Sequence, residues 1–445
     1  MAGGSESPGT LDTYRQFFSL ERDVLVLSAA MFAFSLGFQM TSRYVPEYMA
    51  ALGASAFVIG LFGTVGNVIS ALYPYPGGAL SDRIGSRVSL TVFGLLSSLG
   101  FLFWLLAPTL GTVVIGGIVL EPWIWIFVGL FLAQAWKSFG LGATFAIVKQ
   151  AVPPSRLARG FASTEVFRRS AFLVGPLIAA GVLYVFTDFA VGFQYVLAIA
   201  VVFGLLATAT QHYLYDPAGD SIGKEFEGVS QIVADLRELP PELRPLLVGD
   251  TLVRFANGMV YVFFVIVVTQ FLEVGLVVGG IELSPAVFFG VLLAIEMVVA
   301  LLSMPPAARL AESVGLKPVV AVGFGVYAVF PILLISAPEN ALVLAALFAF
   351  SGLRFAGLPA HKALIVGPAE RDTGGRVSGA YYLVRNLVVI PSAALGGAIY
   401  GGFAIPGTGL SLGGSPTFAF ALASLIGIAG TVYFLAFGKE FEAYA

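Results

Sequence analysis

The residues best suited to do chemistry are charged side chains that interrupt long apolar stretches. Seven are basic and three are acidic, and they are Arg43, Lys137, Glu165, Arg168, Arg169, Asp250, Arg254, Glu296, Arg354 and Arg385. A charge at the depth of a bilayer costs ~2.5–3.5 kcal/mol, so such side chains face a bundle interior or a water-filled cavity and mark functional sites. Because cations outnumber carboxylates, the pattern favours an anionic ligand, to which arginine offers paired hydrogen bonds.

Two of the carboxylates have a basic residue four positions later, one turn along a helix. Glu165 precedes Arg169 and Asp250 precedes Arg254, which is the favourable order for a helical ion pair. With these pairs set aside, Glu296 alone balances the basic residues that remain, which are Arg43, Lys137, Arg168, Arg354 and Arg385. A dry interior does not hold that many unpaired cations, so we expect a bound anion to neutralise them.

Four of these cations occupy matching positions in two diverged copies of one helical unit. Lys137 matches Arg354 and Arg168 matches Arg385 at one offset, since 354−137 and 385−168 both equal 217. We predict that Lys137 and Arg354 bind the anion from opposite sides of a central cavity. The alternative is that they form structural contacts with backbone carbonyls or with Glu296. Arg168 and Arg385 are expected either to form a second ring of substrate contacts or to take part in gating ion pairs.

Glu296 is the first candidate for proton coupling, because a carboxyl in a low dielectric holds its proton more readily. The alternative is that Glu296 is a static partner of a buried arginine. Glu165, Asp250 and His361 are further candidates, although a lone histidine is more often a satisfied hydrogen-bonding group than a proton relay. Arg43 is expected to extend to the membrane surface. The neutral polar residues expected on the cavity wall are Gln134, Asn257, Tyr381, Tyr382 and Asn386.

Helices that cross a bilayer must position these charges. The chain is 58% hydrophobic and 11% charged with a mean hydropathy of +0.93, whereas soluble domains are nearer ~25% charged. A span needs ~20 mostly apolar residues. This criterion predicts about twelve spans, near 24–46, 55–77, 88–108, 122–148, 160–186, 190–212, 246–272, 285–305, 318–337, 340–366, 376–402 and 416–437. Because the second, third, sixth, ninth and twelfth contain no charge, we expect them to face lipid and the others to face the cavity.

The distribution of basic residues predicts the orientation of the chain. With the N-terminus in the cytoplasm, 16 of the 23 Lys and Arg residues lie in cytoplasmic segments and none in outer loops, as the positive-inside rule expects. The predicted fold is an all-α membrane protein of twelve transmembrane helices in two pseudo-symmetric six-helix bundles, with both termini cytoplasmic. The predicted parts are a cytoplasmic N-terminal segment, a first bundle, a cytoplasmic linker with an amphipathic helix, a second bundle and a cytoplasmic tail, over residues 1–22, 23–212, 213–245, 246–438 and 439–445.

The loop after the second expected span has a recognisable pattern of fixed positions. Gly78, Asp82, Arg83, Gly85 and Arg87 match Gly-x-x-x-Asp-(Arg/Lys)-x-Gly-x-(Arg/Lys) at every one of them. In this loop the chain resembles the major facilitator superfamily. The resemblance implies a gating latch between the two halves; the alternative is an ordinary arginine-rich cytoplasmic loop.

Other segments support the resemblance less strongly. Residues 308–317 follow the eighth expected span and form a weaker second copy of the loop, in which Gly315 aligns with Gly85. Gly175-Pro176 is loosely similar to the antiporter motif of the family. Residues 140–143 are similar to its fourth-helix motif, but Trp136 stands at the arginine position of that motif, with Lys137 beside it.

The function expected from these features is secondary active transport of a small organic anion by alternating access, with coupling to protons. The alternatives are a proton-driven exporter of drug-like or lipophilic compounds and, third, a sugar symporter. Internal repeats are common in secondary transporters, whose substrate site lies near the midplane between the repeats. We expect a multi-pass, monomeric protein of the cell membrane whose partners are its substrate, lipid and protons, and not nucleic acid.

Residue usage argues against catalysis. The chain has no cysteine and two histidines, which excludes thiolate chemistry and disfavours a histidine metal cluster. No phosphate-binding loop of the Gly-x-x-x-x-Gly-Lys-(Ser/Thr) type occurs. We therefore expect no enzyme activity, no cofactor and no bound metal.

Overall fold

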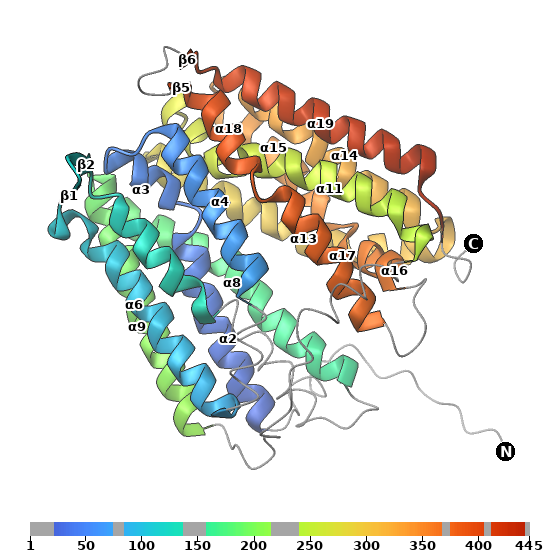
Figure 1. Cartoon of the computed structure of the whole chain (residues 1–445), viewed down its shortest axis with the longest axis horizontal. Helices are drawn as coiled ribbons and strands as arrows, with labels where there is room; N and C mark the ends of the chain where they lie inside the picture. Colours follow the sequence, from blue (N-terminus) through green and yellow to red (C-terminus); the bar gives the residue numbers. More distant parts are fainter. Residues whose placement is uncertain are drawn as a thin grey trace.

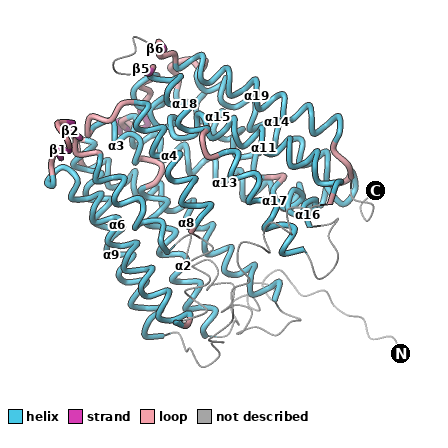
Figure 2. Tube along the Cα trace, viewed as in Figure 1, coloured by secondary structure: helices cyan, strands magenta, loops and turns pink. Residues whose placement is uncertain are grey.

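The computed structural model describes residues 22–73, 84–136, 157–214, 240–366, 374–404 and 411–440, and nearly all of them are helical (Figures 1 and 2). The helices of the first half are α2 (Arg22–Thr41), α3 (Val45–Ala51), α4 (Ala56–Leu72), α6 (Ser86–Leu110), Ile124–Trp136, α8 (Leu157–Val185) and α9 (Phe189–Leu214). Those of the second half are η3 (Pro241–Leu243), α11 (Arg244–Val260), η4 (Tyr261–Phe263), α12 (Phe264–Ile266), the π-helical turn η5 (Val267–Phe271), α13 (Pro285–Val314), α14 (Leu316–Ile335), α15 (Ala341–Gly352), η6 (Leu353–Phe355), α16 (Leu358–Val366), α17 (Gly374–Val389), α18 (Ser392–Gly401) and α19 (Pro416–Phe437).

Most of the long helices coincide with the expected spans to within a few residues, but α13 continues to Val314, beyond the expected end at 305. Among the described residues, eight helices are long and apolar enough to cross a membrane, and four shorter apolar helices accompany them. The prediction of a helical membrane protein is therefore confirmed. The number of spans, the division into the five predicted parts and the side on which the termini lie stay predictions.

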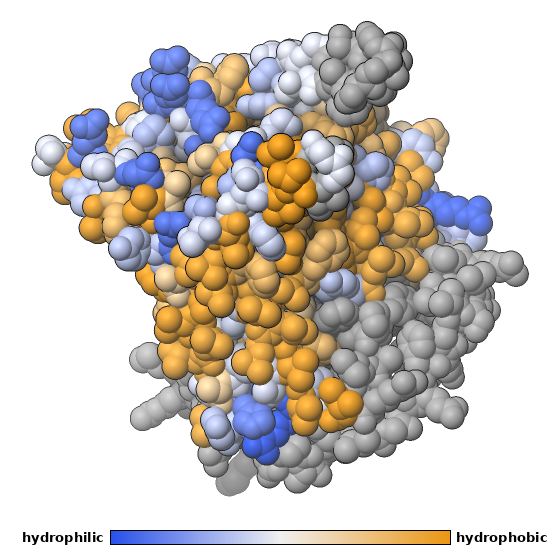
Figure 3. All heavy atoms as spheres, turned by 60° about the vertical axis from the view of Figure 1, so that its left-hand side comes forward, coloured by the Kyte–Doolittle hydropathy of each residue, from blue (hydrophilic) through white to orange (hydrophobic). Residues whose placement is uncertain are grey.

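The outer surface is apolar where a bilayer would contact it. Figure 3 shows hydrophobic residues spread over the middle of one face, with hydrophilic residues gathered mainly toward its ends. Large apolar side chains are exposed along the helices: Leu302 is 71% exposed, Val322 61% and Leu342 76%. An exposed apolar surface of this extent requires lipid around it.

Small polar residues and prolines set the helix starts. The side chains of Ser55, Asn340 and Ser415 accept hydrogen bonds from backbone N–H groups at the starts of α4, α15 and α19, which satisfies donors that no helical carbonyl reaches. Pro285 and Pro416 stand in the first turn, where the missing N–H of proline costs nothing.

Short hairpins connect some of the helices, and the sequence did not predict them. They pair β1 (Val113–Ile115) with β2 (Ile118–Leu120), β3 (Leu276–Val278) with β4 (Ile281–Leu283), and β5 (Phe403–Ala404) with β6 (Ser411–Leu412). A Gly-Gly pair closes each of the first two hairpins with positive φ at both residues, the geometry of a two-residue hairpin turn. The β1–β2 and β5–β6 hairpins lie at the same end of the molecule (Figure 1), which we call the hairpin end.

Two glycines that the predicted repeat aligns adopt the same backbone conformation. Gly85 begins α6 with φ +84° and ψ 154°, and Gly315 begins α14 with φ +91° and ψ 165°. Residues with a side chain rarely adopt this conformation. The alignment of Gly85 with Gly315 therefore matches a shared backbone turn.

The two halves approach each other most closely through α4 against α18 and α8 against α13. A Cβ atom on Gly60 would lie 2.3 Å from the carbonyl oxygen of Ala393, and one on Gly290 would lie 2.7 Å from that of Pro176. Backbone therefore meets backbone across the interface, as small residues permit between membrane helices. The helices of the two halves converge toward the hairpin end and diverge toward the other end (Figure 1).

Polar side chains also join the halves at the hairpin end. The carboxylate of Glu47 in α3 accepts hydrogen bonds from Thr269 Oγ1 at 2.6 Å and from Gln270 Nε2 at 3.0 Å. The hydroxyl of Tyr44 donates to the carbonyl oxygen of Ala286 at 3.1 Å. Burial raises the pKa of Glu47, and the two hydrogen bonds offset part of that rise.

Candidate functional site

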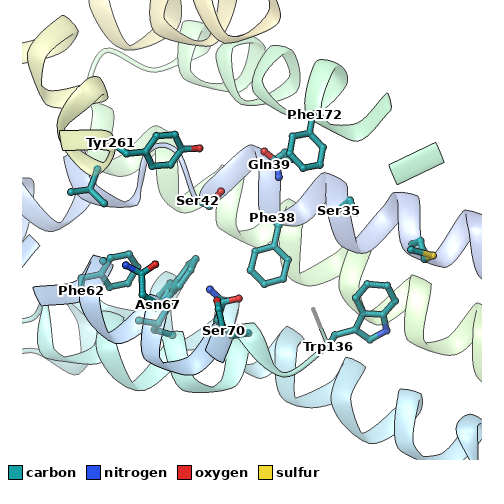
Figure 4. Close-up of a pocket in the computed structure, with 17 residues that line it drawn as sticks. Ser35, Phe38, Gln39, Ser42, Phe62, Asn67, Ser70, Trp136, Phe172 and Tyr261 are labelled. Carbon is teal, nitrogen blue, oxygen red and sulfur yellow. The ribbon is translucent and has the colours of Figure 1, made fainter. Parts of the chain in front are cut away.

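A cavity of ≈ 350 Å³ lies between the halves, and the described residues that line it are all uncharged. We call it the neutral cavity. Its wall comes mainly from α2, α4 and the helix Ile124–Trp136, with Tyr261 and Val262 from the second half (Figure 4). Its polar groups are the amides and hydroxyls of Ser35, Gln39, Ser42, Asn67, Ser70, Gln134 and Tyr261, and its rings include those of Phe38, Phe62, Trp104, Trp136 and Phe172. A volume of this size suits a small molecule.

A second cavity of ≈ 260 Å³ adjoins the first and shares Gly63, Asn67, Tyr261 and Val262 with it. We call it the cationic cavity, because two arginines line it together with two amides. The residues that supply these groups are Arg254, Arg385, Asn257 and Asn386. Arg254 and Asn257 belong to α11, whereas Arg385 and Asn386 belong to α17.

Asp250 lies behind the cationic cavity and is the shared partner of both arginines. Its side chain is fully buried, whereas those of Arg254 and Arg385 are 23% and 16% exposed. Arg254 Nε lies 3.2 Å from Oδ1, and Arg385 Nη1 lies 3.1 Å from Oδ2. The Tyr381 hydroxyl donates to Oδ2 at 3.1 Å, and His361 Nε2 lies 3.3 Å from the same oxygen without hydrogen-bond alignment. Arg385 Nε and Nη2 also donate to the side-chain oxygen of Asn386, at 3.2 and 2.9 Å. One carboxylate thus holds two guanidinium groups that are partly exposed to the cavity and have several of their donors engaged within the protein.

Glu296 organises a second buried cluster. Its Oε1 accepts hydrogen bonds from Arg354 and from the Ser351 hydroxyl, the latter at 3.2 Å. Its Oε2 lies 3.8 Å from Arg43 Nη2 in the other half of the chain. The side chains of Glu296 and Arg354 are 3% and 2% exposed. Their ion pair is therefore enclosed by protein and does not face either cavity.

Tyr327 of α14 lies between the two clusters. Its hydroxyl accepts a hydrogen bond from Arg254 Nη1 at 2.9 Å, and its ring centroid is 4.7 Å from the Arg254 guanidinium carbon. The guanidinium carbon of Arg354 lies 5.1 Å from the same centroid. This contact is close enough for a cation–π interaction, so Tyr327 contacts one arginine of each cluster.

The pairing of charges differs from the sequence prediction. The predicted pair of Asp250 with Arg254 is confirmed. Arg385 was expected to have no carboxylate of its own, and this is wrong because Asp250 contacts it as well as Arg254. Arg354, left open between a ligand and Glu296, contacts Glu296. The alternative, that Glu296 is the partner of a buried arginine, describes the observed contact. These partners come from different helices, so spacing along one helix could not reveal them.

Arg43 does not extend to the membrane surface as expected. The chain turns at residues 42–44 between α2 and α3, and the guanidinium carbon of Arg43 lies 4.3 Å from the ring centroid of Tyr261. The same side chain reaches Glu296 across the interface between the halves. The turn directs Arg43 inward, where a carboxylate and an aromatic face offset the cost of its burial.

The predicted neutral cavity wall is only partly found where expected. Gln134, Asn257 and Asn386 line the cavities. Tyr381 does not, because it is fully buried behind Asp250. Tyr382 packs against Arg385, whose guanidinium carbon lies 4.7 Å from its ring centroid.

The expectation that charge-free spans face lipid is wrong for α4. This helix directs Phe62, Asn67 and Ser70 into the neutral cavity (Figure 4). A count of charges does not register amides and hydroxyls, so it missed these residues and also Gln39 of α2. The only available signal was the polar residues Asn67 and Ser70, three apart on one side of an apolar helix.

Several predicted residues cannot be placed. Lys137, Gly78, Asp82 and Arg83 lie outside the described residues, as does most of the predicted linker 213–245. Glu165 and Arg168 lie on α8, but their side chains are outside what the structure describes. The roles proposed for these residues, and the symmetric pairs of Lys137 with Arg354 and Arg168 with Arg385, stay predictions.

Comparisons with known proteins agree on the architecture. A sequence profile of the Major Facilitator Superfamily matches residues 27–279. An uncharacterized MFS-type transporter of Mycobacterium tuberculosis is 30% identical over 194 residues, which are 43% of this chain and 42% of that protein. The chain thus matches about two fifths of the length of its curated relatives.

Solved structures extend the likeness to almost the whole chain. The nucleoside transporter NupG superposes with a TM-score of 0.69 at 11% identity, over 94% of this chain and 100% of that one. A POT family transporter in complex with 5-aminolevulinic acid also gives 0.69, at 14% identity, over 95% and 99%. At such low identity these similarities show the fold alone.

Proposed function

This chain belongs to the Major Facilitator Superfamily of membrane transporters, and we propose that it moves a small organic anion by alternating access, coupled to protons. The observation that carries the proposal is the cationic cavity between the halves. There, the side chains of Arg254 and Arg385 are partly exposed, whereas their shared counter-ion Asp250 is fully buried. A bound anion would replace the neutral Asn386 oxygen that Arg385 now contacts. Guanidinium groups placed in this way suit a carboxylate or a phosphate.

The charge balance of the described interior supports an anion. In the two clusters four arginines share two carboxylates, since Asp250 is shared by Arg254 and Arg385, and Glu296 is shared by Arg43 and Arg354. Sharing leaves positive charge in excess, which a bound anion would balance.

The contacts between the halves support alternating access. The hairpin end is held by close backbone contacts and by the hydrogen bonds of Glu47 and Tyr44. In the orientation predicted from the basic residues, this end faces outward, so the arrangement corresponds to an inward-facing state. Breaking these contacts while others form at the opposite end would expose the cavities to the outside.

The buried carboxylates support proton coupling. Contact with two guanidinium groups keeps Asp250 ionised, but a bound anion that draws Arg254 and Arg385 away would leave this buried carboxylate to take up a proton. Glu296 would take up a proton in the same way if Arg354 and Arg43 moved away from it. Either event couples proton binding to anion binding or to the contact between the halves. We also propose that the protein is a monomer and that its membrane is the cell membrane.

A transporter of uncharged compounds is the second candidate, because the neutral cavity contains aromatic rings and amides without a charged residue among its described lining. An exporter of drug-like or lipophilic compounds and a sugar symporter, the two alternatives from the sequence, both fall within this second candidate. Such a protein would bind its substrate without the arginines of the cationic cavity.

Ligand-induced stabilisation separates the two candidates. Purified protein is screened by thermal shift against organic acids, phosphates, sugars and cationic drugs, and the compounds found are then tested on Arg385→Gln. Loss of one charged hydrogen-bond partner is expected to lower anion affinity about 10- to 100-fold. Arg244→Gln, at an exposed position of α11, is the matched control. Compounds found only among cations or sugars, with Arg385→Gln binding like the wild type, would refute the anion proposal.

A further inference from the structure

The two cavities differ in chemistry although they share a wall. The cationic cavity offers guanidinium groups, whereas the described lining of the neutral cavity offers only amides, hydroxyls and apolar or aromatic groups. Asn67 and Tyr261 belong to both. One ligand can therefore place an anionic group in the first cavity and an uncharged group in the second.

A polar atom in the neutral cavity lacks a partner. The side-chain oxygen of Gln134 is buried and has no hydrogen-bond partner within the part of the chain that the structure describes. Burial of such an acceptor is unfavourable unless a donor is supplied. Among the same residues, the amides of Gln39 and Asn67 also make no side-chain hydrogen bond, and both project into the cavity from facing helices (Figure 4).

Aromatic rings surround these amides. Phe62 and Trp104 lie with their ring centroids 6.4 Å apart and their planes inclined by 60°, and both line the neutral cavity together with Phe38. Faces and edges of rings attract flat groups with delocalised electrons. Amides next to the rings provide both donors and acceptors.

We propose that the substrate joins its anionic group to a flat, uncharged moiety that carries both hydrogen-bond donors and acceptors, such as a heteroaromatic ring with amide groups. Gln134, Asn67 and Gln39 determine specificity for this moiety, and Arg254 and Arg385 bind the anionic group. The inference rests on the proposed function, because it assigns the anion to the cationic cavity.

Three probes of similar size separate the two parts of the site. Orotate has a ring with amide groups and a carboxylate, benzoate has a carboxylate on a ring without polar atoms, and uracil has the amide ring without a carboxylate. Binding of each to the purified full chain is measured by calorimetry. Orotate is expected to bind at least tenfold more tightly than either of the others, since of the three probes only orotate carries both an anionic group and an amide ring.

Two variants separate the contribution of the neutral cavity to binding from that of the cationic cavity. Gln134→Leu is expected to lower the orotate-to-benzoate affinity ratio five- to tenfold, the loss expected for a hydrogen bond between uncharged groups. Arg385→Gln is expected to lower the orotate-to-uracil ratio at least tenfold. The exposed control Arg244→Gln should change neither ratio.

Each other outcome overturns the inference in a distinguishable way. If orotate and benzoate bind equally and both are lost in Arg385→Gln, the flat polar moiety is not recognised, but the anion proposal stands. If uracil binds as tightly as orotate and Arg385→Gln has no effect, both proposals fail. If none of the three probes binds, the proposal of a substrate with an anionic group and a flat polar moiety is also overturned.

Discussion

Replacement of Asp250 by asparagine tests whether one carboxylate supports the cationic cavity. Asp250→Asn keeps the shape of the side chain but removes the charge that faces Arg254 Nε at 3.2 Å and Arg385 Nη1 at 3.1 Å. Removing one partner of a buried ion pair costs about 3–5 kcal/mol. Because the two arginines are 23% and 16% exposed to the cavity, water offsets part of the penalty. We therefore expect a loss of about 3 kcal/mol in the free energy of unfolding.

The assay is unfolding of the purified protein by titration with a denaturing detergent. Glu242→Gln is the control, because Glu242 is an exposed carboxylate one turn before α11, where a loss below about 0.5 kcal/mol is expected. Added sulfate should stabilise Asp250→Asn more than the wild type, since the variant leaves two guanidinium groups without their anion. Equal stability of the two variants, or equal stabilisation by sulfate in variant and wild type, would refute the account given for Asp250.

Three further predictions concern the second cluster and the contacts between the halves. Glu296→Gln and Arg354→Met should each destabilise the protein, and the double variant should lose less than the sum, with a coupling energy of about 1–3 kcal/mol in a double-mutant cycle; additive losses would contradict the pairing. Because burial raises the pKa of Glu47, the closed hairpin end prefers the protonated carboxyl, so closure is favoured below the ordinary glutamate pKa and weakens as pH rises through the raised value. Cysteines can be introduced into this cysteine-free chain and labelled on both sides of the hairpin end, and the distance between the labels should increase as pH rises. If Glu47→Gln shows the same increase, Glu47 is not the group whose titration opens this end. Gly60→Ala should hold the hairpin end open in the same assay, since the added Cβ would lie 2.3 Å from a carbonyl oxygen of α18. Gly181→Ala is the control, because its Cβ would meet nothing within 4 Å. Similar label distances in the two variants would show that the close contact at Gly60 is unimportant.

Hydropathy located the helices because each span must be apolar along its own length. The expected spans 88–108 and 416–437 correspond to α6 (Ser86–Leu110) and α19 (Pro416–Phe437), since a helix in lipid satisfies its backbone hydrogen bonds internally. The ion pair of Asp250 with Arg254 was predictable for the same local reason, because four residues make one helical turn.

The partners of the other charges could not be predicted from spacing. Glu296 is joined to Arg354 by the packing of α13 against η6, and to Arg43 by the contact between the halves. Such contacts depend on how helices pack and where the chain turns. A count of charges along the sequence contains neither, so it treats a cation without a partner on its own helix as unpaired. The neutral cavity was missed in the same way, because amides such as Asn67 and Gln39 carry no charge to reveal them.

The sequence by itself therefore determined that the chain is a helical membrane protein with charges inside its spans, because the apolarity of a segment and the position of a charge within it are properties of the chain alone. Only the tertiary structure decided which of those charges remain available to a ligand. Asp250 and Glu296 each take two arginines from the predicted set, and of these four arginines Arg254 and Arg385 line a cavity. Burial of a charge depends on all the helices that surround it, so no single segment contains that information.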